Sequence, residues 1–544
     1  MSLSRYTIEF TLSLGVELFE RNHNMSIYVK NSGNIFDYCQ EASIHGEEGS
    51  NQWHWLSGDG VYADFTRALS NSDPRLLIRD PKCESRKTLW PDMPVRIRVL
   101  DQKGHQNFGL RKEFHDANTL QEYLRDHQRL PNRRYVYLVE AYGPRTAIVL
   151  GNHFQLHPSF FVEHERVKTF SYDTSDRSDA VLLPSSLSTR DHITLKYSEP
   201  MHIHQAITEF GLHCHTTGRH ITITRSRDQM LPVGIVRRKC SVWHRETKGG
   251  SDVVILCDPQ ITSVRPDGDG NPFAVQTSSF QGGYVDFIPQ NEQRKSCSGP
   301  PRLSMLDDLT FYLTNHFNLL ANCSGSEGVQ IFINKIIVGH YWELVNFTNA
   351  TLSQAQRRLC RHTDLKDFSM TDVERDWSDA QGNERRSRQY CRELGSVMLQ
   401  LNIAPCAPTH AKITDWTACE EDFQFLLSQF RNLHQVATSV NVAMTTLAGV
   451  AGNRQAAIQQ IQSLREAKRT KALTFVGLVF IPLAYACALF SMADPFSPGG
   501  PLFWVYFLVA IPLVGLVALG NWILDHGYNE DASKWSIRNV LDKL

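Results

Sequence analysis

Two long uncharged segments near the C-terminus limit most strongly what this chain can fold into. Residues 472–491 and 502–522 contain no Asp, Glu, Lys or Arg, and only ten residues separate them. A helix rises about 1.5 Å per residue, so each segment is long enough to cross a hydrocarbon layer of about 30 Å. One such segment could be a buried core helix. Two in close succession favour a helical hairpin that spans a membrane.

The charges that flank these segments predict their orientation. Four basic residues between 465 and 471 precede the first segment, whereas the connecting loop at 492–501 contains no Lys or Arg. Because basic residues stay on the cytoplasmic side, we expect both termini in the cytosol. The first residues match neither a secretory signal nor a transit peptide. We therefore expect a multi-pass protein of the plasma membrane, with the vacuolar and inner mitochondrial membranes as alternatives.

The average composition is that of a soluble protein, so most of the chain is expected outside the membrane. Of the 544 residues, 42% are hydrophobic and 21% are charged, and about 150 residues per domain gives three or four domains. The net charge of −1 argues against nucleic acid as a partner, since a general nucleic-acid binder needs an excess of positive charge. The 12 cysteines form no CxxC pair, which fits a reducing compartment.

The segment before the first span has the pattern of a long stalk helix. Apolar residues recur at heptad spacing over 423–461, with one break at Arg454. A capping box at Thr417 begins the pattern, and no further proline occurs before Pro482. We therefore predict one helix from Thr417 to Ser491. Its apolar stripe must be buried against copies of the same chain or against the chain's own helical hairpin.

The region before the stalk predicts an α/β or α+β domain followed by helices. Residues 303–320 and 352–402 are expected to be helical, with RDWSDAQGNERRSRQ (375–389) as a turn or a solvated face. Short β-rich runs, separated by loops rich in Gly and Pro, occur at 95–100, 135–140, 193–198, 220–225, 233–244 and 253–258.

These patterns divide the chain into eight parts. The predicted parts are an N-terminal mixed α/β region (1–190), a β-rich soluble region (191–300), a helical region (301–412), the stalk helix (413–471), the first transmembrane helix (472–491), an external loop (492–501), the second transmembrane helix (502–522) and a cytosolic tail (523–544).

This order of elements resembles the CorA-like superfamily of divalent metal cation transporters. Lys471-Ala-Leu-Thr474 and Phe480-Ile-Pro-Leu483 look like the beginning of that family's first membrane helix. The phrases FSMADPFSPGG and PLFWVYFLVAIPL resemble the divergent members found in filamentous fungi, and CSVWHRETKGGSDVVILCDP resembles a segment of their soluble domain. The resemblance implies a homopentameric funnel. In it a cytosolic domain precedes stalk helices that line a pore, and the second span forms an outer ring.

The chain departs from this family at the pore mouth. Family members carry an aromatic residue followed by Gly-Met-Asn, whereas this chain has Phe490, Ser491, Met492 and Ala493. Ala493 has no side-chain oxygen, although a site for hydrated Mg²⁺ needs oxygen ligands. Asp494 is the only charge of the loop. In a pentamer it would form a ring of five carboxylates that attracts cations; alternatively, it is an isolated solvated residue that caps a turn.

Helical spacing predicts a pore-lining face on the first span, which we call the small-residue stripe. Small and hydroxyl residues recur there every three or four positions. Such a stripe either lets helices approach closely or lines a narrow pore with a hydrophobic constriction. The stripe consists of Thr470, Thr474, Gly477, Ile481, Ala484 and Ala488, and it leads to Ser491.

A histidine cluster is a weaker candidate for metal binding. His202, His204, His213 and His215 lie close together in the sequence, and imidazole suits Zn²⁺. Their spacing is not that of a zinc finger, and polar strand and turn histidines are the simpler interpretation. The segment RPDGDGNPF (265–273) lacks the Gly and Glu of a calcium loop, so we predict a hairpin loop.

Two functions are consistent with these sequence features, and neither is enzymatic. The first is passive transport of divalent cations, Mg²⁺ first and Zn²⁺, Co²⁺ or Ni²⁺ next, by a homopentameric pore. It requires no cofactor, since the sequence has no nucleotide-binding or hydrolase motif. The second is a non-transporting, membrane-anchored scaffold or sensor that has lost the selectivity motif. The expected partners are the bilayer, further copies of the chain and, for the first function, the transported cation.

Overall fold

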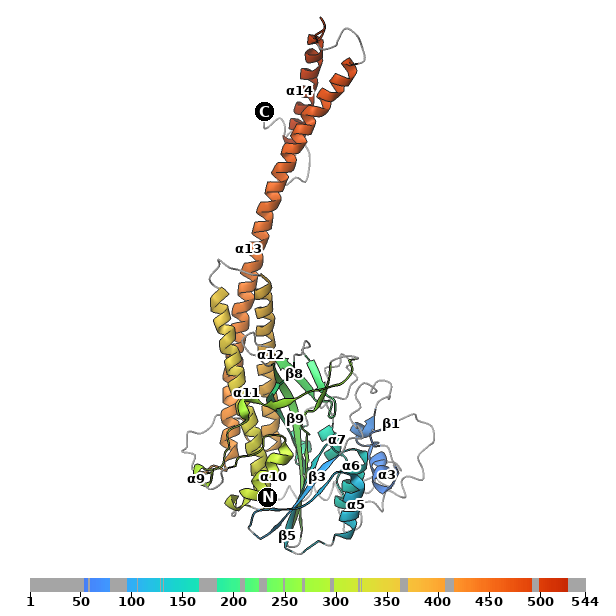
Figure 1. Cartoon of the computed structure of the whole chain (residues 1–544), viewed down its shortest axis with the longest axis vertical. Coiled ribbons are helices and arrows are strands. Elements are labelled where there is room, and N and C mark those ends of the chain that lie inside the picture. The colour runs from blue at the N-terminus through green and yellow to red at the C-terminus, as the bar shows by residue number, and fades with distance from the viewer. Residues whose placement is uncertain are drawn as a thin grey trace, which may run out of the picture. The chain divides into compact units, whose positions relative to one another are not determined.

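The protein divides into two compact units, which are Met1–Arg357 with Ala380–Val440 and Arg358–Asp379 with Asn441–Leu544. The computed structural model in Figure 1 describes residues 53–56, 59–78, 95–104, 106–127, 129–130, 132–165, 183–205, 211–224, 232–247, 250–266, 270–293, 298–320, 323, 325–362, 370–406, 415–491 and 499–526.

A mixed sheet of eleven strands forms the centre of the first unit. The strand order is β12-β11-β7-β8-β9-β10-β5-β3-β4, and β6 pairs with β9 and β13 beside this path. Among the strands that the structure describes, β5 and β10 pair in parallel and the other pairs are antiparallel. The strands are β3 (Arg96–Lys103), β4 (Gly109–Phe114), β5 (Arg133–Glu140), β6 (His192–Ile203), β7 (Gly211–Cys214), β8 (His220–Thr224), β9 (Val233–Thr247), β10 (Gly250–Cys257), β11 (Ser263–Pro266), β12 (Phe273–Ala274) and β13 (Thr277–Ser279); β1 (Trp53–His54) and β2 (Leu77–Ile78) form a separate pair.

Helices cover both faces of this sheet (Figure 1). In β5, Val136 and Leu138 join the core on one face, whereas Tyr135, Tyr137 and Val139 join the core on the other. This alternation follows from the two-residue period of a strand. The short helices are α3 (Val61–Leu69), η2 (Pro74–Leu76), α5 (Ala117–Asp126), α6 (Pro144–Phe154), α7 (Ser159–Glu165), α8 (Pro184–Leu187), η3 (Phe280–Gly282), α9 (Gln290–Gln293), α10 (Met305–Asn315) and η4 (Phe317–Leu320).

Three long helices follow, and the stalk prediction is confirmed in its essentials. They are α11 (Gly325–His362), α12 (Met370–Gln400) and α13 (Cys419–Phe490). The stalk helix α13 contains 72 residues in one helix, and its ends lie within two residues of the predicted ones.

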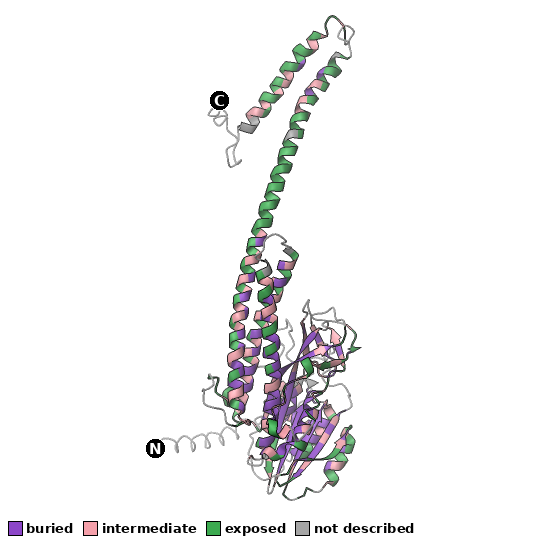
Figure 2. Cartoon of the chain, turned by 60° about the vertical axis from the view of Figure 1, so that its left-hand side comes forward, coloured by how far each residue is buried: buried purple, intermediate pink, exposed green. Residues whose placement is uncertain are grey.

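The partner of the apolar stripe is now defined for the first part of α13. Phe423, Leu426, Phe430, Leu433 and Ala437 are buried in one core with residues of the chain's own α11 and α12. From Asn453 to Lys471 the helix is exposed, as Figure 2 shows for its middle part.

The helical region differs from the prediction in two places. RDWSDAQGNERRSRQ lies inside α12 and is not a turn. Ion pairs one turn apart, such as Arg388 with Glu384 at 2.6 Å, support a helix without an apolar stripe. Helix α11 begins at Gly325, well before the predicted residue 352. Its buried residues between Val329 and Leu344 are spread over successive positions, so the sequence lacks the one-sided period of an amphipathic helix.

One sheet contains strands from both sides of residue 190, where we predicted a boundary between two regions. Strands β3, β4 and β5 lie before this boundary, and they continue the same sheet as β6 to β13. Each of the six predicted β-rich runs overlaps a strand, and these strands are β3, β5, β6, β8, β9 and β10. The predicted hairpin is confirmed as well, since β11 and β12 pair antiparallel on either side of the loop.

The packing of α13 predicts a large effect of one core substitution. Phe430 is fully buried between the rings of Tyr341 and Tyr390. Phe430→Ala should lower the free energy of unfolding by about 3 to 5 kcal/mol, because it leaves a cavity. The matched control Phe425→Ala, on the same helix but 43% exposed, should cost less than about 1 kcal/mol. Thermal unfolding followed by tryptophan fluorescence measures both; equal losses would contradict this packing.

Candidate functional site

The second unit holds two helices that are long and apolar enough to cross a membrane. They are the last part of α13, up to Leu489, and α14 (Trp504–His526) over Trp504–Ile523. Only 12% and 6% of the residues in their most apolar windows are buried. The core helix of a soluble protein would be mostly buried. Exposure of this much apolar surface fits a lipid environment or contact with further chains, so the two helices are candidate membrane spans.

One face of the span in α13 packs against α14. Ala486 on α13 and Ala510 on α14 are each 1% exposed, and Pro482 is buried on the same side of α13. Cys487 also lies near α14, since its Sγ donates a hydrogen bond to the hydroxyl oxygen of Tyr506 at 3.2 Å. Small side chains therefore mark the face at which the two helices approach closely.

The small-residue stripe lies on a different side of α13. At about 100° per residue, it is roughly 140° around the helix from Pro482 and Ala486. Its members are exposed, except Gly477, which is partly buried, and Ile481 is 71% exposed. Contact with α14 therefore does not explain the stripe. In the structure α14 leaves this face uncovered, so lipid, water or another copy of the chain can contact it.

The signature residues lie where α13 ends. Phe490 is the last residue of the helix, and Ser491 follows it, exposed and donating its backbone N–H to the carbonyl of Cys487 at 2.9 Å. Met492, Ala493 and Asp494 lie outside the described residues, so the carboxylate ring stays a prediction.

The four histidines do not form a metal site in the structure. His202 lies in β6, and His204 follows it with its Nε2 2.8 Å from the hydroxyl of Ser278. His213 lies in β7, paired in register with His220 of β8. Since β8 and β9 separate β7 from β6, about 14 Å lies between these strands. His215 follows β7, and in the described part of the chain no three His, Cys, Asp or Glu side chains gather around one point. These positions fit strand and turn histidines, which the sequence analysis gave as the simpler interpretation.

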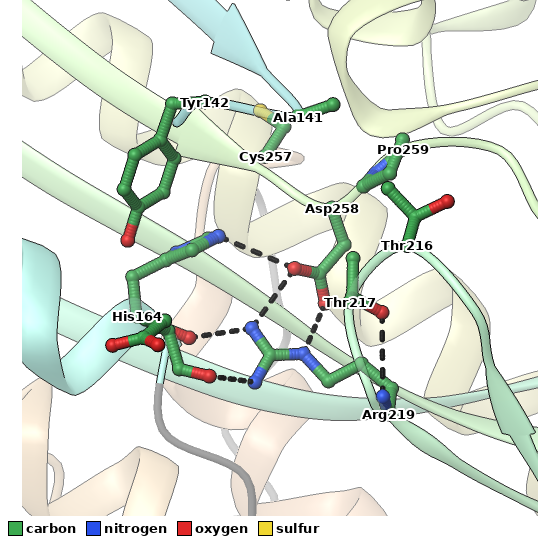
Figure 3. Close-up of a pocket in the computed structure, with 10 residues that line it drawn as sticks. Ala141, Tyr142, His164, Thr216, Thr217, Arg219, Cys257, Asp258 and Pro259 are labelled. Carbon is green, nitrogen blue, oxygen red and sulfur yellow. Dashed lines mark hydrogen bonds and ion pairs between the residues drawn. The ribbon is translucent and has the colours of Figure 1, made fainter. Parts of the chain in front are cut away.

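A pocket in the first unit was not predicted from the sequence (Figure 3). It lies where the parallel strands β5 and β10 end, with Ala141 and Tyr142 after one strand and Asp258 and Pro259 after the other. The carboxyl ends of parallel strands are a common place for ligand sites. The apolar run VVILCDP that ends in an aspartate was the available sequence signal.

A buried ion pair occupies this pocket. Arg219 donates from Nε to Asp258 Oδ2 at 2.8 Å and from Nη2 to Asp258 Oδ1 at 2.9 Å. Burial alone would raise the pKa of Asp258, but the Arg219 guanidinium and His164 outweigh it and hold that pKa well below its usual range. Burial lowers the pKa of His164 to about 4 against the opposing effect of Asp258, so His164 is neutral at pH 7.

The chemistry of the pocket is that of a structural clamp. Burial raises the pKa of the Cys257 thiol, which keeps it protonated and unreactive. Arg219 also donates to the carbonyl of His164 at 2.5 Å, and Lys239 donates its backbone N–H to Asp258 at 2.7 Å. These bonds tie α7, the β7–β8 turn, β9 and the end of β10 together.

Comparison with known proteins gives structural matches alone. No family model and no curated protein matches the chain. One match is described as the structure of the full-length CmaX protein; it is 11% identical, covers 79% of this chain and 97% of that chain, and has a TM-score of 0.28. Another is the complete structure of the CorA magnesium transporter from Methanocaldococcus jannaschii, 9% identical, covering 77% and 96%, with a TM-score of 0.29. Both TM-scores are low, so we base the function on this chain's own residues.

The clamp predicts a pH dependence of stability. The pKa of His164 is about 4 in the folded state and about 6.5 in the unfolded state. Below pH 6.5 the unfolded chain binds the proton first, so stability falls as the pH falls towards 4. From pH 7 to pH 5 the loss due to His164 should be about 2 kcal/mol. His164→Gln should remove this part of the pH dependence of the free energy of unfolding. The control His115→Gln, at an exposed position, should retain it. Chemical unfolding at each pH measures both; an unchanged slope in His164→Gln would contradict the assignment.

Proposed function

We propose that this protein forms a passive transmembrane pathway for divalent metal cations, Mg²⁺ first and Zn²⁺, Co²⁺ or Ni²⁺ next. The observation that carries the proposal is the continuity of α13. One helix contains both the residues that pack in the core of the first unit and the apolar residues of the first span. An ion pathway along this helix would be continuous from the soluble unit to the far side of the membrane.

Several copies of the chain are needed to enclose such a pathway. The small-residue stripe faces away from α14, and two helices alone cannot surround a pore. Further along α13, Ile458, Ile461 and Leu464 are 48%, 51% and 57% exposed. Contact between copies would bury this surface. The number five comes from the resemblance to the CorA-like superfamily, and the transport needs no ATP because the ions move down their gradient.

A non-transporting scaffold or sensor is the alternative. Ser491 and Ala493 replace the Gly and Asn of the family signature, and a scaffold would retain the hairpin without a selectivity site. Ion flux separates the two functions.

Flux through the purified protein in liposomes is the test. Wild type should admit Mg²⁺, and in detergent it should have the mass of five chains of 62.0 kDa each. Ala484→Leu, on the exposed small-residue stripe, should reduce flux by about tenfold or more because it narrows the pathway. The matched control Ala518→Leu, exposed on α14, should leave flux unchanged. If wild type transports none of the four ions, the transport proposal fails and the scaffold function remains. If both substitutions reduce flux equally, the small-residue stripe does not line the pathway.

A second prediction concerns the pore mouth. Five Asp494 carboxylates near one axis would raise the local concentration of cations. Asp494→Asn should therefore lower uptake severalfold at low ion concentration and low ionic strength, and the difference should disappear in high salt. Asp494→Glu, which keeps the charge, should transport like wild type. Unchanged uptake by Asp494→Asn at every concentration would contradict the ring.

A further inference from the structure

A row of charged and aromatic side chains crosses four adjacent strands of the sheet in the first unit. Asp101 on β3 and Asp252 on β10 both stand beside Tyr135 on β5, in register on either side. Arg245 on β9 stands opposite Asp252. Residues paired across strands point to the same face of a sheet, so these side chains share one surface.

Each carboxylate of the row meets two guanidinium groups. Asp101 accepts hydrogen bonds from Arg111, at 3.0 Å, and from Arg133. Asp252 accepts from Arg245, at 3.4 Å, and from Arg129. Four guanidinium groups therefore face two carboxylates, which leaves a net charge of two positive charges. We call the four arginines, Arg111, Arg129, Arg133 and Arg245, the arginine row.

The arginine row is both held in place and open to solvent. The guanidinium carbons of Arg111 and Arg129 lie 6.0 Å and 5.9 Å from the ring centre of Tyr135, which is 1% exposed. The four arginine side chains are 28% to 41% exposed. A guanidinium has five N–H donors, and in each of these arginines one nitrogen binds an aspartate.

His127 adds support for Arg111 without adding charge. Burial, and then the positive charge of Arg111, lower the pKa of His127, so the ring is neutral at pH 7. Its Nδ1 lies 3.4 Å from Nη2 of Arg111, and its ring stacks on Tyr123 with 4.9 Å between centres. The orientation of Arg111 is thus restricted before any ligand arrives.

We propose that the arginine row binds a small anion that carries several phosphate groups. The planar fork of a guanidinium matches the oxygens of phosphate. Asp101 and Asp252 are two strand spacings apart, or about 10 Å, so one arginine pair lies on each side of Tyr135. A single phosphate can engage one pair, whereas a chain of phosphates can extend from one pair to the other. This binding does not depend on the transport function.

Calorimetric titration of the full-length protein in detergent tests the proposal, with inorganic triphosphate and inorganic monophosphate as probes. Triphosphate should bind at least tenfold more tightly than monophosphate. The double variant Arg111→Gln, Arg129→Gln should weaken triphosphate binding at least tenfold. It leaves Asp101 with Arg133 and Asp252 with Arg245, so each carboxylate keeps a partner. The control Arg67→Gln, Arg125→Gln removes the same charge from exposed pairs with Asp64 and Asp126 and should bind like wild type.

Adenosine triphosphate, titrated without metal, identifies the source of the phosphates. Affinity equal to that of inorganic triphosphate means that the phosphates alone are recognised, and higher affinity means that the nucleoside also makes contacts; both support the proposal. Absence of triphosphate binding by wild type overturns it. An equal loss of binding in the two double variants also overturns it, because the effect would then be one of overall charge.

Discussion

The structure depends on one helix, α13, whose first part packs in a protein core and whose last part is apolar enough to lie in lipid. Within a helix every internal backbone N–H and C=O is bonded inside the segment, which is what allows a chain to enter lipid. Helix α13 uses this property over 72 residues. Only its side chains change along its length, from a buried stripe packed on α11 and α12, through an exposed charged segment, to apolar residues on all sides.

The first unit is built so that the beginning of this helix is firmly anchored. Its sheet carries a core on each face, and the core that includes Phe423 and Phe430 also includes strand residues such as Leu138 and Ile255. At the end of β10, the Arg219–Asp258 pair adds a buried polar link between elements that the apolar cores also join. Removing one partner of a buried pair leaves an uncompensated charge, which costs about 3 to 5 kcal/mol.

Much of this architecture was predictable because its signals are local. The heptad stripe and the lack of proline predicted α13 to within two residues, and apolar runs predicted six strands. For 375–389 the turn was the wrong alternative, because the segment continues α12, whereas the solvated face fits, since most of its residues are exposed or half-buried. The pairing of β5 with β10 joins residues more than a hundred positions apart, and no local pattern encodes it. Likewise, spacing defined the small-residue stripe, but only the hairpin shows which side of α13 faces α14.

In the proposed function, the side of α13 away from α14 borders a water-filled path. Thiol accessibility tests this placement most directly, in a Cys487→Ser background reconstituted into liposomes; the reaction of that background alone, which keeps the exposed Cys360 and Cys406, is subtracted. Ala484→Cys should react with a charged, membrane-impermeant thiol reagent, and Mg²⁺ should slow the reaction. Leu516→Cys, exposed on α14, should stay unreactive because it faces lipid. If Ala484→Cys is as unreactive as Leu516→Cys, the small-residue stripe faces lipid, which would contradict a water-filled path along α13.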